Sequence, residues 1–202
     1  MSDADRDKWD DRYATGTHGN REHPTTFLAR WEARLPQGRA LDVACGTGRN
    51  AVFLARTGRS VVAVDISRAG LERARRLAAR DGADVDFVEA DLDTETDRVL
   101  RNGPFDLIVL VRYVNRGLVP RLADALADGG CLLVEQHLVS DADVVGPQSA
   151  EHRYGRNELL REAMEAAPLL RVLCYRESLV EDPDGRPAAL AQLVACRAPG
   201  PF

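Results

Sequence analysis

Residues 41–50, LDVACGTGRN, place glycines where an apolar run gives way to a helical pattern. Gly46 and Gly48 let the backbone turn abruptly and approach a ligand closely, because glycine has no Cβ atom. The stretch from Gly46 to Ala51 also satisfies the G-x-G-x-x-G/A pattern, and Asp65 ends the next apolar run 17 residues after Gly48. An acid at that place is typical of ribose binding. The chemistry indicated is the binding of a nucleoside at a strand-to-helix turn.

Asp42 indicates the charge of that ligand. A pyrophosphate at a helix N-terminus needs a positive potential, and a carboxylate a few residues upstream raises its energy. A ligand that carries an ammonium and a sulfonium group is favoured beside Asp42 instead. The alternative is an ordinary hydrogen-bonded carboxylate at the end of a strand, and the sequence leaves both interpretations open.

The elements that must position these residues alternate from about residue 39 onward. Apolar runs predict buried strands, and apolar residues at helical spacing predict the helices between them. Ser67 is placed to cap the helix after the second strand. The predicted strands are 40–45, 60–65, 85–90, 105–111, 131–137, 170–176 and 188–197. The predicted helices are 3–14, 24–35, 49–57, one beginning after Ser67, 117–127 and 157–167, and 93–103 is expected to be a short polar segment.

The order of these elements predicts the fold. Neither face of the first five strands alternates with polar residues, which is typical of a doubly wound parallel sheet covered on both faces. Asp184-Gly185 is a hairpin signal, so the last two strands should be antiparallel to each other. We therefore expect an α/β, Rossmann-like, seven-stranded sheet, mostly parallel, with an antiparallel C-terminal hairpin and helices on both faces. The ligand crevice should lie beyond the carboxyl ends of the strands.

Composition excludes several classes of protein. The chain has 202 residues with 32 acidic and 27 basic side chains, a formal charge of −5, and 45% apolar residues, which suffice for one folded domain. Without a basic excess we expect no binding to nucleic acid. No stretch approaches the roughly 20 apolar residues that span a bilayer, and the first residues are acidic, so we expect a cytoplasmic protein without a membrane partner.

The cysteines carry no motif. Cys45, Cys131, Cys174 and Cys196 lie far apart, without a C-x-x-C pair or a histidine at ligand spacing. We expect them to be strand residues that behave as small hydrophobes. The sequence therefore predicts neither a metal site nor a structural disulfide.

Five segments in order resemble a known family. LDVACGTGRNAVFLA, VVAVDIS, VEADL, FDLIVLV and ADGGCLLVE look like the class I S-adenosylmethionine-dependent methyltransferases over residues 39–137, and the terminal hairpin extends the likeness to about residue 197. The segment 9–13, WDDRY, together with CGTGRN, is similar to the branch that includes tellurite-resistance and thiopurine-type methyltransferases. The resemblance implies S-adenosylmethionine as cofactor, an N-terminal helical cap over 1–38 and a methyltransferase domain over 39–202.

The resemblance also assigns roles to single residues. It implies that Asp42 serves the methionine amine, that Asp65 accepts from the two ribose hydroxyls, and that Asp91 accepts from the exocyclic amine of adenine. The other cofactor-binding positions that it implies are Ala44, Gly46, Gly48, Asn50, Ile66, Leu92, Val111, Trp9 and Tyr13. Ala44 departs from the pattern, because many members have glycine there.

Methyl transfer from a sulfonium is an in-line displacement, so positioning and the exclusion of water should be the principal contributions of the protein. A lid is therefore expected. Trp9 and Tyr13 are four residues apart on one helical face, which fits a first helix that acts as that lid. An aromatic pair that merely packs the helix on the domain fits equally well.

Candidate catalytic residues follow the fourth and fifth strands. Arg112 and Tyr113 come after the fourth strand, and Arg112 with Arg116 would hold an anionic group or form ordinary salt bridges. His137 ends the fifth strand and would take a proton from a hydroxyl or amine, unless its role is structural. A thiolate, selenide or telluride would need no base.

The leading hypothesis is a methyltransferase that acts on a small-molecule nucleophile, with sulfur, selenium or tellurium as the accepting atom. One alternative is an oxygen or nitrogen methyltransferase of a biosynthetic pathway. A nicotinamide-dependent oxidoreductase and a nucleoside-binding module without catalysis are the alternatives from other classes.

Overall fold

The computed structural model describes residues 3–17, 19–166, 170–181 and 185–198. Its elements in chain order are α1 (Asp3–Ala14), α2 (Thr26–Trp31), the 3₁₀ turn η1 (Glu32–Arg34), β1 (Arg39–Val43), α3 (Arg49–Arg56), β2 (Ser60–Asp65), α4 (Arg68–Asp81), β3 (Val85–Glu89), α5 (Thr96–Leu100), β4 (Phe105–Val111), α6 (Leu118–Asp124), β5 (Leu126–His137), the 3₁₀ turn η2 (Ala150–His152), α7 (Glu158–Ala166), β6 (Leu170–Glu181) and β7 (Pro187–Arg197).

One sheet carries the seven strands in the order β3-β2-β1-β4-β5-β7-β6. β1 pairs with both β2 and β4 in parallel, whereas β7 runs antiparallel to both β5 and β6. The expected fold class is thereby confirmed, including the reversed hairpin at the end. The strand order reverses at β1, which is where a doubly wound sheet opens a crevice at the carboxyl ends of its strands.

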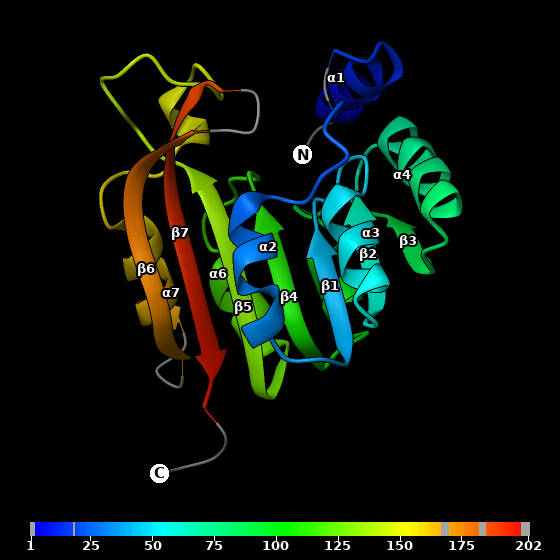
Figure 1. Cartoon of the computed structure of the whole chain (residues 1–202). Helices are drawn as coiled ribbons and strands as arrows, with labels where there is room; N and C mark the ends of the chain where they lie inside the picture. Colours follow the sequence, from blue (N-terminus) through cyan, green and yellow to red (C-terminus); the bar gives the residue numbers. More distant parts are fainter. Residues whose placement is uncertain (1–2, 18, 167–169, 182–184, 199–202) are drawn as a thin grey trace.

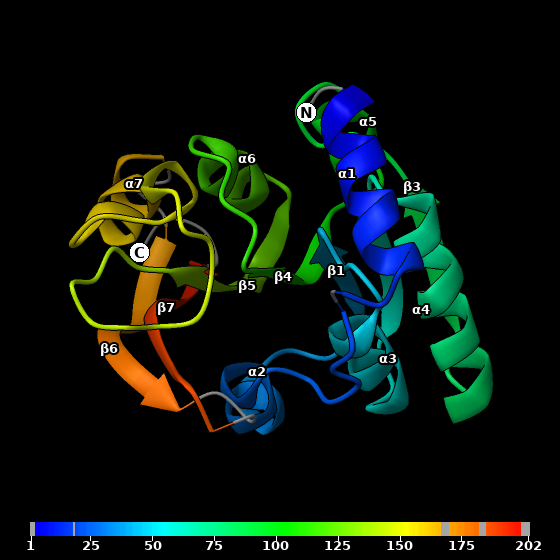
Figure 2. The ribbon, with the colours of Figure 1, turned by 90° about the horizontal axis from the view of Figure 1, so that it is seen from above.

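The two faces of the sheet are covered by different helices (Figure 2). Along β4, Leu107 and Val109 pack with Phe27 and Leu28 on the side of α2 and α3. Ile108 and Leu110 of the same strand belong to the cluster with α6 and α7 on the other side. Successive strand residues point to opposite faces, so strands buried on both sides read as continuous apolar runs.

The N-terminal segment crosses the edge of the sheet at which the parallel strands end. In Figure 1 the parallel strands point upward, and α1 lies above that edge beside α4. α2 instead packs on the sheet, and Thr25 caps it by accepting a hydrogen bond from the Leu28 amide at 3.3 Å. The expected division into a cap over 1–38 and a domain over 39–202 stays a prediction. None of the helices in the described ranges is long and apolar enough to cross a membrane.

Some local predictions differ from the structure. The polar segment 93–103 contains a short helix, α5, whose Val99 is buried in the core. β5 begins at Leu126, ahead of the predicted strand 131–137, and runs through Gly129 and Gly130. The expected helix 24–35 ends as the 3₁₀ turn η1. Residues 182–184, with the Asp184 of the expected hairpin signal, lie outside the described residues.

The prediction that the chain has no disulfide is wrong. Cys131 of β5 and Cys196 of β7 are bonded to each other, while Cys45 and Cys174 are free thiols. The antiparallel register sets Cys131 directly opposite Cys196, although 65 residues separate them along the chain. Cysteine spacing does not reveal a pair that only strand register creates. Cys45 also lies just after β1 rather than inside a strand.

We expect the double variant Cys131→Ala, Cys196→Ala to unfold with a free energy lower by about 2–4 kcal/mol, because the cross-link restricts the unfolded chain. Urea denaturation of the oxidised protein and the variant measures the difference. Cys174→Ala is the control and should unfold with the same free energy as the wild type. Titration of four reactive thiols in the denatured, unreduced protein would contradict the pairing.

Candidate active site

The turn after β1 adopts a left-handed backbone at three places. Ala44, Gly46 and Gly48 have φ angles of 55°, 57° and 81°. A Cβ atom on Gly48 would lie 2.7 Å from the Cβ of Ala74, so glycine is what lets α4 pack against the turn. Ala44, the departure from the family pattern, accepts the strained conformation as a non-glycine residue.

Asp65 fastens this turn to the end of β2. Its Oδ2 accepts a hydrogen bond from the Gly46 amide at 2.7 Å, and its Oδ1 accepts from the Ser67 amide at 2.9 Å. Burial raises the pKa of Asp65 to about 6, and the amides of Ser67 and Gly46 oppose that rise. The carboxyl group is thus part of the architecture of the turn, and its expected bonds to a ribose stay a prediction.

Asp42 lies near the end of β1, where its side chain accepts from the Ala51 amide in the first turn of α3. It is 1% exposed, and burial raises its pKa to about 7, while the Ala51 amide and the Arg49 charge oppose the rise. Its Oδ2 is buried and accepts no hydrogen bond in the structure. A buried acceptor without a donor is unfavourable by roughly 1–3 kcal/mol, so the site favours a ligand that supplies a donor or a positive charge.

Asn50 joins the turn to α2. Its Oδ1 accepts from the Thr25 amide at 3.0 Å, and the side chain is buried. The other expected cofactor positions, Ile66, Asp91, Leu92 and Val111, are also buried, at or just beyond the carboxyl ends of β2, β3 and β4. The structure therefore gathers the expected residues at one edge of the sheet. Their roles toward the cofactor stay predictions.

Tyr13 of α1 is seated on the glycine turn. A Cβ atom on Gly46 would lie 2.8 Å from the Tyr13 hydroxyl, and one on Gly70 would lie 3.0 Å from Cδ2 of the same ring. Trp9 stacks on Tyr13 with 5.7 Å between ring centroids. Burial, together with the charge of Asp65, raises the pKa of Tyr13 and keeps its hydroxyl protonated. The aromatic pair thus lies at the predicted cofactor site.

Polar contacts, which sequence reasoning missed, hold α1 in place. Asp10 Oδ1 accepts from the Ser67 hydroxyl at 2.5 Å and from the Ala69 amide at 3.0 Å, at the N-terminus of α4. Arg73 of α4 donates to the carbonyl oxygens of Tyr13 and Gly19 at 3.1 and 3.0 Å. The only signal for Asp10 was its place in WDDRY, and nothing in the sequence marks Arg73.

A row of polar side chains crosses the sheet beyond β4. Glu135 is 2% exposed, and its Oε1 accepts from Arg112 Nε at 3.3 Å. Its Oε2 accepts from Gln192 Nε2 at 2.7 Å, and Gln192 Oε1 in turn accepts from Arg176 Nε at 2.6 Å. Arg112 has a φ of 58°, and its amide also donates to the Glu135 carbonyl at 2.7 Å. Arg112 is therefore engaged in an ion pair.

His137 follows Glu135 by two residues and points to the same face of β5. The ring is buried, and a Cβ atom on Gly146 would lie 2.6 Å from its Nδ1. The segment that passes over it is held by the buried Arg153, which donates to the carbonyls of Pro147 and Leu138 at 2.7 and 2.9 Å. His137 is thus enclosed under the segment 139–155.

Tyr113 points elsewhere than the other expected catalytic residues. Its hydroxyl donates to Asp93 Oδ1 at 3.3 Å, in the loop after β3. Arg116 pairs with Glu158 at 2.5 Å and also donates to the carbonyls of Glu151 and Arg153. The structure therefore brings Arg112, Glu135 and His137 to one region, whereas Tyr113 joins a different loop and Arg116 pairs on the surface.

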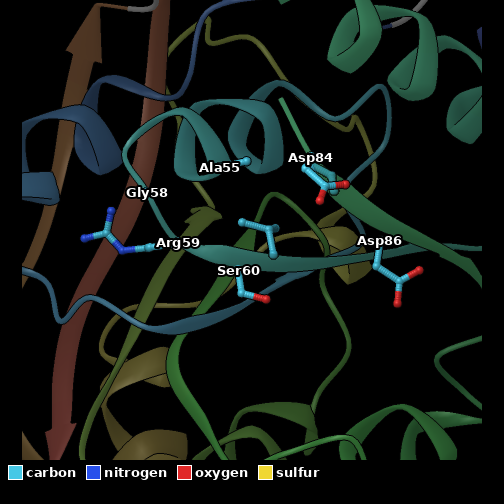
Figure 3. Close-up of a pocket in the computed structure, with 8 residues that line it drawn as sticks. Ala55, Gly58, Arg59, Ser60, Asp84 and Asp86 are labelled. Atoms are coloured by element: carbon cyan, nitrogen blue, oxygen red, sulfur yellow. The ribbon is translucent and has the colours of Figure 1, made fainter. Parts of the chain in front are cut away.

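A hollow at the opposite edge is not a candidate site (Figure 3). It lies where β2 and β3 begin, with Arg59 on one side and Asp84 and Asp86 on the other. The Arg59 guanidinium is engaged with Glu32 at 2.9 Å and with the Pro36 carbonyl at 2.9 Å. Ligands of doubly wound sheets bind at the carboxyl ends of the strands, which is the other edge.

Comparison with known proteins points to methyltransferases. A family described as a methyltransferase domain matches residues 40–130. A ribosomal protein L11 methyltransferase of Symbiobacterium thermophilum is 31% identical over 165 residues, which are 79% of this chain and 46% of that protein. The chain thus spans about half the length of this relative.

Two further proteins are matched over a larger share of their own length. A 2-phytyl-1,4-naphtoquinone methyltransferase of Synechococcus elongatus is 30% identical over 163 residues, which are 70% of each protein. The crystal structure of TehB from Haemophilus influenzae has the same fold, with a TM-score of 0.66, 21% identity, and coverage of 95% of this chain and 66% of that one. The chain belongs to the class I S-adenosylmethionine-dependent methyltransferases.

Proposed function

We propose that the protein transfers the methyl group of S-adenosylmethionine to a soft nucleophile on a small molecule, namely a thiolate, a selenide or a telluride. The observation that carries the cofactor part is the buried Asp42 carboxyl, whose Oδ2 lacks a donor. The methionine ammonium group of the cofactor is such a donor, directly or through a water molecule. A phosphate in the same place would be repelled.

The other residues fit the remaining parts of the cofactor. Asp65, at the end of β2, would accept from the ribose hydroxyls, since each carboxylate oxygen can accept two hydrogen bonds. Asp91 would accept from the exocyclic amine of adenine, and the Leu92 amide would face a ring nitrogen. Ile66 and Val111 would supply apolar contacts, and Ala44, Gly46, Gly48 and Asn50 would form the turn along which the nucleoside lies.

The bound cofactor supplies a methyl group on a positively charged sulfur, which needs a nucleophile aligned with the leaving sulfur. Charge is neutralised during the reaction when the nucleophile is an anion, so a dry site favours it. α1 would exclude water, because Trp9 and Tyr13 cover the glycine turn and Asp10 holds the helix on α4.

The acceptor side supports a nucleophile that needs no base. Three titratable side chains lie where β4 and β5 end, and each is occupied or enclosed. Glu135 accepts from both Arg112 and Gln192, and His137 is buried beneath Gly146. The Tyr113 hydroxyl donates to Asp93, and burial raises the pKa of the phenol, so it stays protonated at neutral pH and is not available to take up a proton. A thiolate or a heavier chalcogenide is already deprotonated and requires none of these groups.

The acceptor can be tested by incubation of the protein with labelled S-adenosylmethionine and a panel of thiols, selenite and tellurite with a reductant, and phenols. We expect transfer to sulfur, selenium or tellurium, and we expect His137→Ala to retain turnover within about tenfold, because the imidazole is not the base. A loss of a hundredfold or more with intact cofactor binding, or transfer to phenols alone, would favour an oxygen methyltransferase instead.

The cofactor contact of Asp42 can be tested by calorimetry with S-adenosylhomocysteine. We expect Asp42→Asn to weaken binding by about tenfold or more, because a charged hydrogen bond contributes roughly 1.5–3 kcal/mol. Methylthioadenosine, which lacks the amino acid part, is the matched control ligand and should bind both proteins equally. Equal affinity of both proteins for S-adenosylhomocysteine would contradict the role of Asp42.

Asp42→Asn should also change how stability depends on pH. Burial raises the Asp42 pKa to about 7 in the folded protein. The folded state therefore keeps a proton that the unfolded chain loses near its ordinary pKa of about 4, so this carboxyl lowers stability as pH rises from about 4 to 7. We expect the free energy of unfolding of the variant, relative to the wild type, to increase over that interval by on the order of 3 kcal/mol.

Denaturation of both proteins at several pH values measures that change. Asp65, whose pKa burial raises to about 6, is present in both proteins, so the difference between them reports mainly on Asp42. A difference that is independent of pH would mean that Asp42 has the same pKa in the folded and the unfolded protein.

A further inference from the structure

Two loops that follow distant strands meet at one carboxylate. β3 and β4 are separated in the sheet by β2 and β1. Nevertheless Asp93, after β3, accepts hydrogen bonds on its Oδ1 from Asn115 Nδ2 at 2.8 Å and from the Tyr113 hydroxyl at 3.3 Å, both after β4. The contact ties the loop after β4 to the loop that is predicted to hold adenine.

Asp93 passes this constraint on to Asp91. The Asp93 amide donates to Asp91 Oδ1 at 2.8 Å, and the Asp91 amide donates to Glu95 Oε2 at 2.9 Å. The amide of Glu95 also donates to the Asp91 carbonyl at 2.7 Å. These bonds set both the backbone and the side chain of Asp91. A displacement of Asp93 would therefore reorient the carboxylate of Asp91.

The loop after β4 is itself firmly anchored. Gln136 of β5, fully buried, donates from Nε2 to the Tyr113 carbonyl at 2.7 Å. The Tyr113 ring packs against the core, and the Leu118 amide donates to the Asn115 carbonyl at 3.2 Å. Because burial raises the pKa of the Tyr113 phenol, its hydroxyl remains a donor over the whole neutral range. The two donors toward Asp93 thus come from a fixed support.

We propose that Tyr113 and Asn115 are positioning residues, which hold Asp93 and through it orient the Asp91 carboxylate toward the 6-amino group of adenine. The inference deepens the proposed function and rests on its placement of adenine at Asp91. It gives Tyr113 a place on the cofactor side rather than at the methyl acceptor. Selectivity for the adenine base is then determined in part by side chains beyond β4 that need not touch the base.

The test compares two ligands that differ at position 6 of the base and, as a consequence, in the proton on the adjacent N1. S-Adenosylhomocysteine has an amine there, which a carboxylate can accept from, whereas S-inosylhomocysteine has a carbonyl oxygen, which a carboxylate repels. Calorimetry gives the affinity of each ligand for the wild type, Asn115→Ala, Tyr113→Phe and the double variant. Tyr175→Phe is the matched control, because its hydroxyl bonds Glu177 on β6, the strand at the far edge of the sheet from β3.

We expect the wild type to prefer the adenine ligand. Asn115→Ala should weaken its binding by about tenfold and Tyr113→Phe by about threefold, in line with the 2.8 and 3.3 Å bonds that each removes. The inosine ligand should change by less than about twofold, so the preference shrinks in the variants. Tyr175→Phe should bind both ligands as the wild type does. Thermal unfolding without ligand verifies that each variant is folded.

The other outcomes overturn the inference in distinct ways. An unchanged preference with unchanged affinity would show that Asp91 is oriented without this contact. Equal weakening of both ligands would show a general structural role rather than positioning. If the wild type bound neither ligand, the proposed function would fail and the inference with it, whereas binding by the wild type with unaffected variants refutes the inference alone.

Discussion

The hydrogen bond from the Gly46 amide to the Asp65 carboxyl holds the site together, because it joins the turn after β1 to the end of β2. The left-handed backbone of Ala44 and Gly46 is unfavourable for most residues, and it persists because surrounding bonds determine it. The conformation of the turn then determines where α3 begins and where Tyr13 of α1 packs. A single buried carboxylate thus fixes both the conformation of the turn and the position at which Tyr13 packs on it.

Two buried acids beside the turn after β1 are unfavourable for the folded state. Burial raises the pKa values of both Asp42 and Asp65, and the charge of Asp65 further raises the pKa values of Asp42 and Tyr13. Stable cores usually avoid such groups unless they are paired. A cofactor with a positive charge and several donors would relieve that cost on binding, so the same residues that weaken the empty protein would strengthen the complex. Stability and binding therefore oppose each other at this turn.

Much of the fold could be predicted from the sequence, since strands buried on both faces give continuous apolar runs and Ser67 gives a recognisable cap. The residues at strand ends could be predicted because parallel strands share one edge. Contacts that depend on register or on docking could not. Three contacts join residues far apart in the chain, and no sequence spacing indicates them. They are the Cys131–Cys196 disulfide, the polar row from Arg112 to Arg176, and the hydrogen bonds of Asp10 at the N-terminus of α4. The short helix α5 was missed because its segment is mostly polar.

The buried Arg153 has a consequence for the segment over His137, which would border the methyl acceptor in the proposed function. Its guanidinium donates to carbonyl oxygens of the segment that contains it, from Leu138 to Pro147, so this segment, a wall over His137, is cross-braced along its own length. Gly146 sits within the braced stretch against the imidazole of His137 and leaves no room for a side chain. Such a wall has one shape rather than many. An enzyme built this way would diversify by exchanging residues at the rim, and not by flexing to admit larger molecules.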